Sequence, residues 1–537
     1  MPQTRRYPTR NAKIALLQCH GPSRPNRRNK DLPLYSKSDS DNEKPTASSS
    51  RTKTVVIVGG GVGGLAVAAR IASSSAREQK NARVIVLEKN DLVGGRCGSF
   101  VVSHPKGNFR HERGPSLLLL PHIYRQIFQD CTDNRSLTPE QDFGLNMVPC
   151  NPAYQVIFDD GQCVNVGFRR TQETDREDTS ITPESSSSQS QSSTEYSALE
   201  RDSRRILDSI EPNGAAKWDK YLDLCQAYLD CGLPNFIQQQ LDLPSFPAFF
   251  RAVLQAWPLQ AHSNMVDNLF DSTKLRAMAT FQDLYVGLEP YQNPKLVAGG
   301  IAQSTAPAVF GLLAAIELHP TNPMCGVYAP IGGFEAVAQS LYKLAESLGV
   351  QVQCGKTVTR VTNNGVYYRT TTQSFSDSKT SDEFLQADLV VVNADLPYAR
   401  QVLVKDNDDQ LEKYTPAYDW KEKEEGRPLP FGFSCGVIAF HWSLDKELTD
   451  LNTHNVFLAT QTREIAEQSW NVLRSNRKPT SRDFSAANFY VHRASKTDPS
   501  AAPQVCYDTF HHRVVSGILF SILPCFCCFI YVFVSGL

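Results

Sequence analysis

Residues 54–96 constrain the fold most, because an apolar strand, a glycine-rich turn, a helix and a second strand follow one another there. Residues 55–58 are apolar and β-branched without alternation, which predicts a strand of a parallel sheet that is covered on both faces. A helix is expected over residues 65–74. The turn between strand and helix carries three glycines in the spacing GxGxxG, namely Gly59, Gly61 and Gly64.

This turn predicts a site for the phosphates of a dinucleotide. The first glycine permits the tight turn, the second lets backbone amides approach a pyrophosphate, and the third lets the helix pack on the sheet. The unpaired N–H groups and the dipole at the helix N-terminus favour negative charge. The second strand, residues 84–87, ends at Glu88, whose carboxylate is placed to accept hydrogen bonds from an adenosine ribose.

The loop after Glu88 carries a second motif, Gly94-Gly95-Arg96. An arginine on such a loop can fold back over the pyrophosphate, where its planar guanidinium supplies a fixed cation. The glycine turn followed by this loop resembles the FAD-binding amine oxidase and carotenoid desaturase superfamily. The resemblance implies FAD rather than NAD, held by the glycine turn and by Glu88, Gly95 and Arg96.

The net charge and the cysteine spacing argue against nucleic-acid binding and against a metal site. The chain has 537 residues, enough for more than one domain, and a formal net charge of −1. It therefore lacks the basic footprint of a nucleic-acid-binding protein. The 14 cysteines show no paired CxxC spacing in the polar part of the chain. They are expected to be reduced and mostly buried, with no metal site. The sequence predicts no particular oligomeric state.

Residues 1–50 are rich in Arg, Ser, Pro and Asn, and no acidic residue precedes Asp31. Two interpretations fit this bias equally well: an organelle transit peptide, for a plastid for example, and a solvated, disordered tail. A secretory signal is not expected, because the apolar run over residues 14–17 is too short for its hydrophobic region.

Residues 109–128 contain Gly114-Pro115, which forces a turn, and then an apolar run over residues 117–120. The segment is similar to the GPSLLL stretch of the bacterial-type phytoene desaturase and carotenoid isomerase family, which lies beside the flavin. Glu112 precedes the turn and has two interpretations. It is a catalytic carboxylate if burial raises its pKa, or a loop carboxylate that accepts hydrogen bonds from nearby amides, and we favour the second.

The middle of the chain predicts a second domain of mixed structure. Residues 143–166 alternate around Asp160-Gly161, which indicates a β-hairpin, and the apolar spacing after Gly214 indicates a helix. Residues 169–204 are rich in Ser, Glu, Thr and Gln and cannot bury a core. A disordered surface insertion is therefore expected there.

Three apolar stretches of this region bear on a substrate. Residues 275–289 and 304–317 are helical in pattern and resemble the family's walls around a long apolar tunnel. Residues 241–259 combine bulky aromatic side chains with little charge. They form either a face that lies in a bilayer surface, which would make the protein a peripheral membrane protein, or an internal helix.

The chain then returns to the pattern of a dinucleotide domain. A helix is expected after Gly333, a strand over residues 350–354, a polar hairpin around Asn364, and a buried strand over residues 387–393. The arrangement resembles the second half of a flavin domain. The resemblance implies that the backbone N–H and C=O of Val358 bind the adenine ring.

These segments predict an α/β fold in which a Rossmann-like FAD-binding domain carries an inserted α+β substrate domain. Both domains are discontinuous in the chain. The expected division is a disordered or transit segment over 1–50, FAD-binding parts over 51–142 and 325–402, substrate-domain parts over 143–324 and 403–503, and an apolar tail over 504–537.

The tail contains an uncharged stretch over residues 514–534. At about 1.5 Å per residue it is long enough to cross a bilayer of roughly 30 Å, so a C-terminal transmembrane anchor is one interpretation. The other, which we favour, is a translated intron or a shifted reading frame. After Pro503 the resembling family continues to a final glycine-rich strand and helix that contact the flavin.

The resemblance extends over residues 53–503, apart from the serine-rich insertion. It implies a phytoene dehydrogenase-like oxidoreductase that desaturates phytoene or a related carotene by hydride transfer to flavin, with an apolar polyene as its substrate. A carotene cis/trans isomerase that uses reduced FAD has the same scaffold. Two non-catalytic alternatives also remain: a prenyl- or lipid-binding protein like the Rab GDP dissociation inhibitors, and an inactive truncated product.

Overall fold

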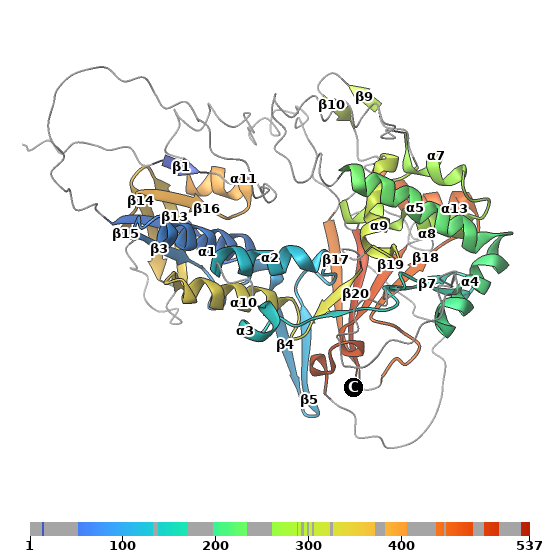
Figure 1. Ribbon diagram of the computed structural model, residues 1–537, viewed down its shortest axis with the longest axis horizontal. Coiled ribbons are helices and arrows are strands. Elements are labelled where there is room, and N and C mark those ends of the chain that lie inside the picture. Colours follow the sequence, from blue (N-terminus) through green and yellow to red (C-terminus); the bar gives the residue numbers. More distant parts are fainter. Residues whose placement is uncertain are drawn as a thin grey trace, which may run out of the picture.

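The computed structural model describes residues 13–15, 52–132, 138–169, 197–232, 260–286, 288–291, 295–297, 300–302, 306–322, 326–370, 382–404, 436–444, 447–475, 488–503 and 528–536. Two sheets organise this part of the chain, and each collects strands that lie far apart in the sequence (Figure 1).

The first sheet has five parallel strands in the order β1-β16-β2-β3-β12. They are β1 (Lys13–Ala15), β2 (Lys53–Val58), β3 (Ala82–Leu87), β12 (Gln351–Gln353) and β16 (Leu389–Val392). Strands from both ends of the predicted dinucleotide domain therefore pair directly. This pairing confirms that the domain is Rossmann-like and interrupted by an insertion.

Both faces of this sheet are covered, as the unbroken apolar strands predict. On one face, Val55 and Ile57 of β2 pack with the helices α1 (Val62–Arg77), α2 (Pro121–Thr132) and α10 (Phe334–Ser347). On the other face, Val56 and Val58 pack with a three-stranded sheet and with the segment after β16. These elements are β13 (Lys356–Thr362), β14 (Gly365–Thr370), β15 (Glu383–Gln386), α11 (Leu396–Tyr398) and the π-helix η6 (Ala399–Leu403).

The second sheet has six strands in the order β17-β20-β19-β18-β7-β8. They are β7 (Tyr154–Phe158), β8 (Cys163–Val166), β17 (Gly436–Leu444), β18 (His454–Leu458), β19 (Phe489–Arg493) and β20 (Cys528–Gly536). The hairpin of β7 and β8 is the one predicted around Asp160-Gly161, and Gly161 adopts a φ of +85° there. Residues 154–166 and 454–493 thus share one sheet, so this domain is discontinuous too.

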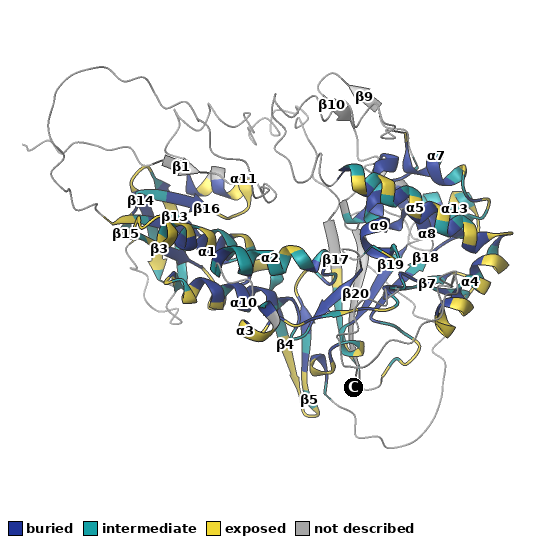
Figure 2. Ribbon diagram, viewed as in Figure 1, coloured by how far each residue is buried: buried dark blue, intermediate teal, exposed yellow. Residues whose placement is uncertain are grey.

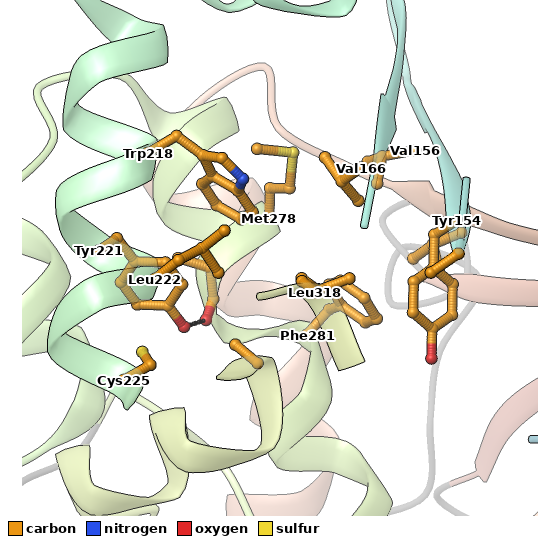
Figure 3. Packing of buried hydrophobic residues seen from close by; sticks show 14 of the residues in the cluster. Tyr154, Val156, Val166, Trp218, Tyr221, Leu222, Cys225, Met278, Phe281 and Leu318 are labelled. Atoms are coloured by element: carbon orange, nitrogen blue, oxygen red, sulfur yellow. Dashed lines mark hydrogen bonds between the residues drawn. The ribbon is translucent and has the colours of Figure 1, made fainter. Parts of the chain in front are cut away.

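Helices cover one face of the second sheet and enclose an apolar core (Figures 1 and 3). Trp218, Tyr221 and Leu222 of the predicted helix point into that core, opposite Tyr154 of the sheet (Figure 3). The helices are α4 (Ala198–Ile210), α5 (Gly214–Gly232), α7 (His262–Asp267), α8 (Thr273–Thr280), η4 (Phe281–Val286), η5 (Ala308–Gly311), α9 (Leu312–Leu318) and α13 (Arg463–Ser475).

Short elements join the two domains. The antiparallel pair β4 (Ser99–His104) and β5 (Gly107–Glu112) leaves the first domain, and β6 (Met147–Pro149) pairs with β11 (Tyr328–Pro330) where the chain crosses back. Figure 2 shows the tip of the β4–β5 hairpin exposed and its base buried. The remaining elements are α3 (Pro139–Asp142), β9 (Lys295–Val297), β10 (Gly300–Ala302), η1 (Gly95–Cys97), η8 (Ala494–Lys496) and η9 (Pro499–Ala501).

The structure corrects the predicted insertion over residues 169–204, because α4 begins at Ala198. Ser197 caps this helix by accepting a hydrogen bond from the backbone N–H of Glu200. Ser-x-x-Glu is a capping-box sequence, and Leu207 on the same helix is buried in the core. A helix start was therefore present at the end of a stretch that composition alone assigned to disorder.

Two terminal predictions also need correction. Lys13–Ala15 forms an edge strand of the first sheet, although residues 1–50 were predicted to be disordered or a transit segment. In the tail, Cys528–Gly536 is a strand between β17 and β19 and not part of a helical anchor. Most of residues 514–534, and the whole of residues 241–259, lie outside the described residues. Among the helices that the structure describes, none has the length and apolar character needed to cross a membrane.

Candidate dinucleotide site

The glycine turn lies between β2 and α1, and two of its glycines are required by close packing. A Cβ on Gly59 would come within 2.5 Å of the Asn393 carbonyl oxygen, and a Cβ on Gly64 within 2.0 Å of the Gly59 carbonyl oxygen. Around Gly61, by contrast, the nearest atom to a Cβ would be 3.7 Å away. A Cβ at the middle glycine would thus make ordinary van der Waals contacts without a clash, so packing within the protein does not require a glycine there, which fits a glycine kept for the approach of a pyrophosphate to the backbone.

The helix start next to this turn suits an anion. α1 begins at Val62 after Gly61, which makes no side-chain capping bond, and the first turn contains no acidic residue. The N–H groups of a first helical turn have no partner within the helix, and the helix dipole adds positive potential there. Backbone alone thus offers a phosphate site at the position that the sequence predicted.

Glu88 is buried at the end of β3 and fixed beside the turn. Its Oε2 accepts a hydrogen bond from the backbone N–H of Gly60 at 2.7 Å. Its Oε1 accepts from the backbone N–H of Asn90 at 2.9 Å and from the side-chain amide of Asn90 at 2.7 Å. Three donors therefore hold an acceptor group next to the phosphate site, in the place expected of a ribose ligand.

The loop over Gly94-Gly95-Arg96 lies across the glycine turn. Gly94 adopts a φ of +119°, and its N–H donates to the Gly60 carbonyl oxygen at 2.9 Å. The Arg96 side chain is 90% exposed and its guanidinium lies 3.6 Å from the carboxylate of Asp395. A contact this exposed is weak, so the guanidinium is not fixed by protein partners and remains available to an anion.

Val358 lies where the second half of the domain meets Glu88. The N–H of Lys356, at the start of β13, donates to the Glu88 carbonyl oxygen at 2.8 Å. Val358 is buried two residues later, and the pairing of β13 with β14 shifts register between Val358 and Arg360. The structure thus brings Val358 near Glu88, while adenine binding by its backbone stays a prediction.

Glu112 is the last residue of β5 and is not in a loop. Its Oε2 accepts from the backbone N–H of Phe334 at 2.9 Å and from the Ser99 hydroxyl at 3.0 Å, while its Oε1 lies 3.3 Å from Arg110. Burial raises the pKa of this carboxyl, and the Phe334 amide and Arg110 oppose that rise. Both oxygens are therefore engaged, and the carboxylate caps the N-terminus of α10, which agrees with the hydrogen-bonded interpretation.

Two features of the site were missed by the sequence prediction. Asn393, directly after β16, packs its side chain against Gly61, Gly63 and Gly64 of the turn. The signal was available, since a polar residue follows a buried strand at the carboxyl edge of the sheet, where ligands bind in such folds. A cleft also opens beside the loop, and it is lined by Lys89, Asn90, Asp91, Leu92, Val93, Gly95, Gly98, Ser99, Arg113 and Glu335. Within the described residues, no cluster of His, Cys, Asp or Glu has the geometry of a metal site.

The chain is similar to known proteins both at this site and beyond it. Residues 57–133 match the model of the NAD(P)-binding Rossmann-like domain. The chain is 28% identical over 449 residues to the phytoene desaturase of Neurospora crassa, which covers 83% of this chain and 62% of the relative. It is 29% identical over 457 residues to the phytoene desaturase of Cercospora nicotianae, with 83% and 58% covered.

The chain thus spans about three fifths of the length of these fungal relatives. Among solved structures, the PF1083 protein of Pyrococcus furiosus is 14% identical, with a TM-score of 0.39, over 76% of this chain and 72% of that one. The sequence similarity continues far beyond the glycine turn, through both domains. The chain is thus similar to phytoene desaturases over 83% of its own length.

Proposed function

We propose that this protein is an FAD-dependent oxidoreductase that desaturates phytoene or a related carotene. The observation that carries the proposal is the buried Glu88 carboxylate, held 2.7 Å from the Gly60 amide at the glycine turn. A protein without a bound dinucleotide has no use for this arrangement. The similarity to phytoene desaturases supports the substrate class.

The residues present fit FAD in their donor and acceptor chemistry. The turn around Gly61 and the start of α1 would hold the pyrophosphate, Glu88 would accept from the adenosine ribose, and Arg96 would supply a cation over the phosphates. The backbone of Val358 would contact the adenine. When bound, FAD supplies the ring that accepts a hydride, and the protein supplies binding, orientation and exclusion of water.

The second domain suits an apolar substrate. Its core is a continuous cluster of buried aliphatic and aromatic side chains from the sheet and from α5, α8 and α9. A polyene offers almost no polar group to recognise, so its binding depends on burial of apolar surface. Because such a molecule partitions into lipid, we also propose that the protein meets its substrate at a membrane surface.

Anaerobic turnover with two substrates tests the proposal. The purified chain is reconstituted with FAD and incubated with phytoene, and separately, after reduction of the FAD, with a poly-cis carotene. The products are separated by chromatography. We expect more conjugated products from phytoene together with reduction of the flavin. Isomerised product without net flavin reduction would identify an isomerase instead, and no product from either substrate with FAD bound would contradict both activities.

A matched pair of variants ties any activity to the dinucleotide site. Glu88→Ala removes the proposed ribose acceptor, whereas Glu346→Ala removes a carboxylate that accepts from the Tyr342 hydroxyl on the surface of α10. Activity is expected to fall in the first variant and to stay at the parent level in the second. Equal activity of both variants would contradict the role of Glu88.

A further inference from the structure

A strip of chain over residues 114–120 runs from the glycine-arginine loop into the substrate domain. At its start, a Cβ on Gly114 would come within 2.9 Å of the Arg96 carbonyl oxygen, and the N–H of Arg113 donates to the Gly98 carbonyl oxygen at 3.1 Å. The strip thus begins in direct contact with the loop that crosses the glycine turn.

Farther along, the strip belongs to both apolar cores. Leu118 is fully buried in the core of the first domain and exchanges two backbone hydrogen bonds with Tyr328, at 3.0 and 2.9 Å. The leucines around it pack on the core of the second domain, namely Leu117, Leu119 and Leu120. The strip is therefore a wall shared by the dinucleotide domain and the apolar domain.

The polar residue of this wall is anchored from the second sheet. The Ser116 hydroxyl lies 3.1 Å from the hydroxyl of Tyr490 on β19, and that hydroxyl lies 2.6 Å from Nδ1 of His454 on β18. Nε2 of His454 in turn lies 3.5 Å from Sγ of Cys150. All four side chains are buried. Ser116 and Tyr490 are 374 positions apart in the sequence, so the chain of contacts joins distant segments.

The hydrogen bonds of this chain depend on the charge of His454. Burial and the neighbouring His492 hold the pKa of His454 well below its usual value, so the imidazole is neutral. A neutral imidazole has one N–H, so one ring nitrogen donates and the other accepts, and the hydroxyls of Tyr490 and Ser116 can turn to match either tautomer. In both cases one continuous chain of hydrogen bonds joins the wall to the sheet.

We propose that Tyr490 and His454 are positioning residues that fix Ser116, and with it the wall formed by residues 114–120, against the cofactor loop. The inference rests on the proposed function, because it assigns the wall to the border between a bound flavin and an apolar substrate. A hydroxyl that is held in one orientation keeps the strip at one distance from the loop over Arg96. The second sheet, which carries Tyr490 and His454, thereby sets the geometry of the cofactor site.

Removing single hydroxyls tests this coupling. Tyr490→Phe and Ser116→Ala each remove one member of the chain, and the double variant removes both. The readouts are the FAD dissociation constant of the apoprotein, measured by quenching of flavin fluorescence, the visible spectrum of the bound flavin, and kcat and KM with phytoene. Tyr342→Phe is the matched control, because it removes a hydroxyl that bonds to Glu346 on the surface.

We expect Tyr490→Phe and Ser116→Ala to shift the flavin spectrum and to lower kcat by about tenfold. A tenfold change in rate corresponds to the free energy that one buried hydrogen bond typically contributes. KM is expected to change less than kcat, and the double variant to resemble the single ones, since the residues act as a unit. His454→Asn, whose amide can donate or accept in place of Nδ1, is expected to keep the parent spectrum, whereas His454→Leu is expected to lose it.

Two results would overturn the inference. One is a parent-like flavin spectrum and FAD affinity in Tyr490→Phe and Ser116→Ala, even if their melting temperatures fall. The other is a double variant in which the effects of the two substitutions on kcat, expressed as free energies, simply add. The proposed function fails separately, when the parent protein binds FAD and converts no polyene. In that case the spectrum and the FAD affinity still decide whether the wall is coupled to the cofactor site.

Discussion

The backbone N–H of Gly60 donates to the buried carboxylate of Glu88 across the ends of two neighbouring strands, at 2.7 Å. This bond joins the glycine turn and the proposed ribose acceptor into one unit. Preorganisation of this kind lowers the cost of ordering side chains on binding. The predictions below test which residues serve binding, which serve packing, and which do both.

The glycines of the turn are expected to separate packing from binding. Gly64→Ala places a Cβ 2.0 Å from the Gly59 carbonyl oxygen, so it should lower the melting temperature and abolish dinucleotide binding. Gly61→Ala meets no atom closer than 3.7 Å, and Gly61 has a φ of −74° that alanine adopts readily. This variant should fold normally and bind FAD at least tenfold more weakly, as judged by calorimetry and flavin fluorescence. Parent-like FAD affinity in folded Gly61→Ala would contradict the assignment.

Glu112 is expected to stabilise the fold without taking part in catalysis. Glu112→Ala leaves the half-buried guanidinium of Arg110 without one of its carboxylates and the N-terminus of α10 without its cap. We expect a loss of about 2–5 kcal/mol in unfolding free energy by chemical denaturation. Glu112→Gln keeps an acceptor for the Phe334 amide and should retain kcat with a smaller stability loss. A fall in kcat of a hundredfold or more in folded Glu112→Gln would instead identify a catalytic carboxyl.

We expect the stability of the substrate domain to depend on pH through Glu317. Its Oε2 accepts from the Tyr154 hydroxyl at 2.9 Å, and burial raises the pKa of this carboxyl to about 8. Because the folded state binds the proton more tightly than the unfolded state, this group favours folding most below pH 4.5. That contribution declines between pH 4.5 and about 8, by up to about 1.4 kcal/mol per pH unit.

Thermal unfolding across this pH range checks the prediction for Glu317. Glu317→Gln stays neutral at every pH, so its melting temperature should fall less than that of the parent between pH 5 and 8. The difference between the two proteins should therefore grow with pH in favour of the variant. Parallel curves for parent and variant would show that Glu317 does not titrate in this range.

The first domain was predictable because its signals are local. The strand ending at Val58, the spacing of three glycines and the carboxylate of Glu88 lie within a short stretch, and each has a fixed physical role. The helix after Gly333 and the strand ending at Val392 followed from periodicity in the same way. The pairing of β12 with β3 and of β16 with β2 confirms a fold that the resemblance implied.

The parts that sequence reasoning missed depend on contacts between distant positions. Ser116 meets Tyr490, and Tyr490 meets His454, only because three separate segments converge. No spacing rule connects them. Asn393 lies beside the glycine turn for the same reason, since β16 enters the sheet beside β2. The start of α4 at Ala198 is different, because its capping box at Ser197 was legible in the sequence.

The central claim is that an adenine dinucleotide binds across the turn after β2, with Glu88 as the ribose acceptor. The most direct measurement is a titration of the purified apoprotein with FAD, followed by flavin fluorescence, for the parent and for Glu88→Ala. The parent is expected to bind FAD and turn yellow, and the variant to bind at least tenfold more weakly. A colourless parent that takes up no FAD, or a variant with the parent's affinity, would contradict the account.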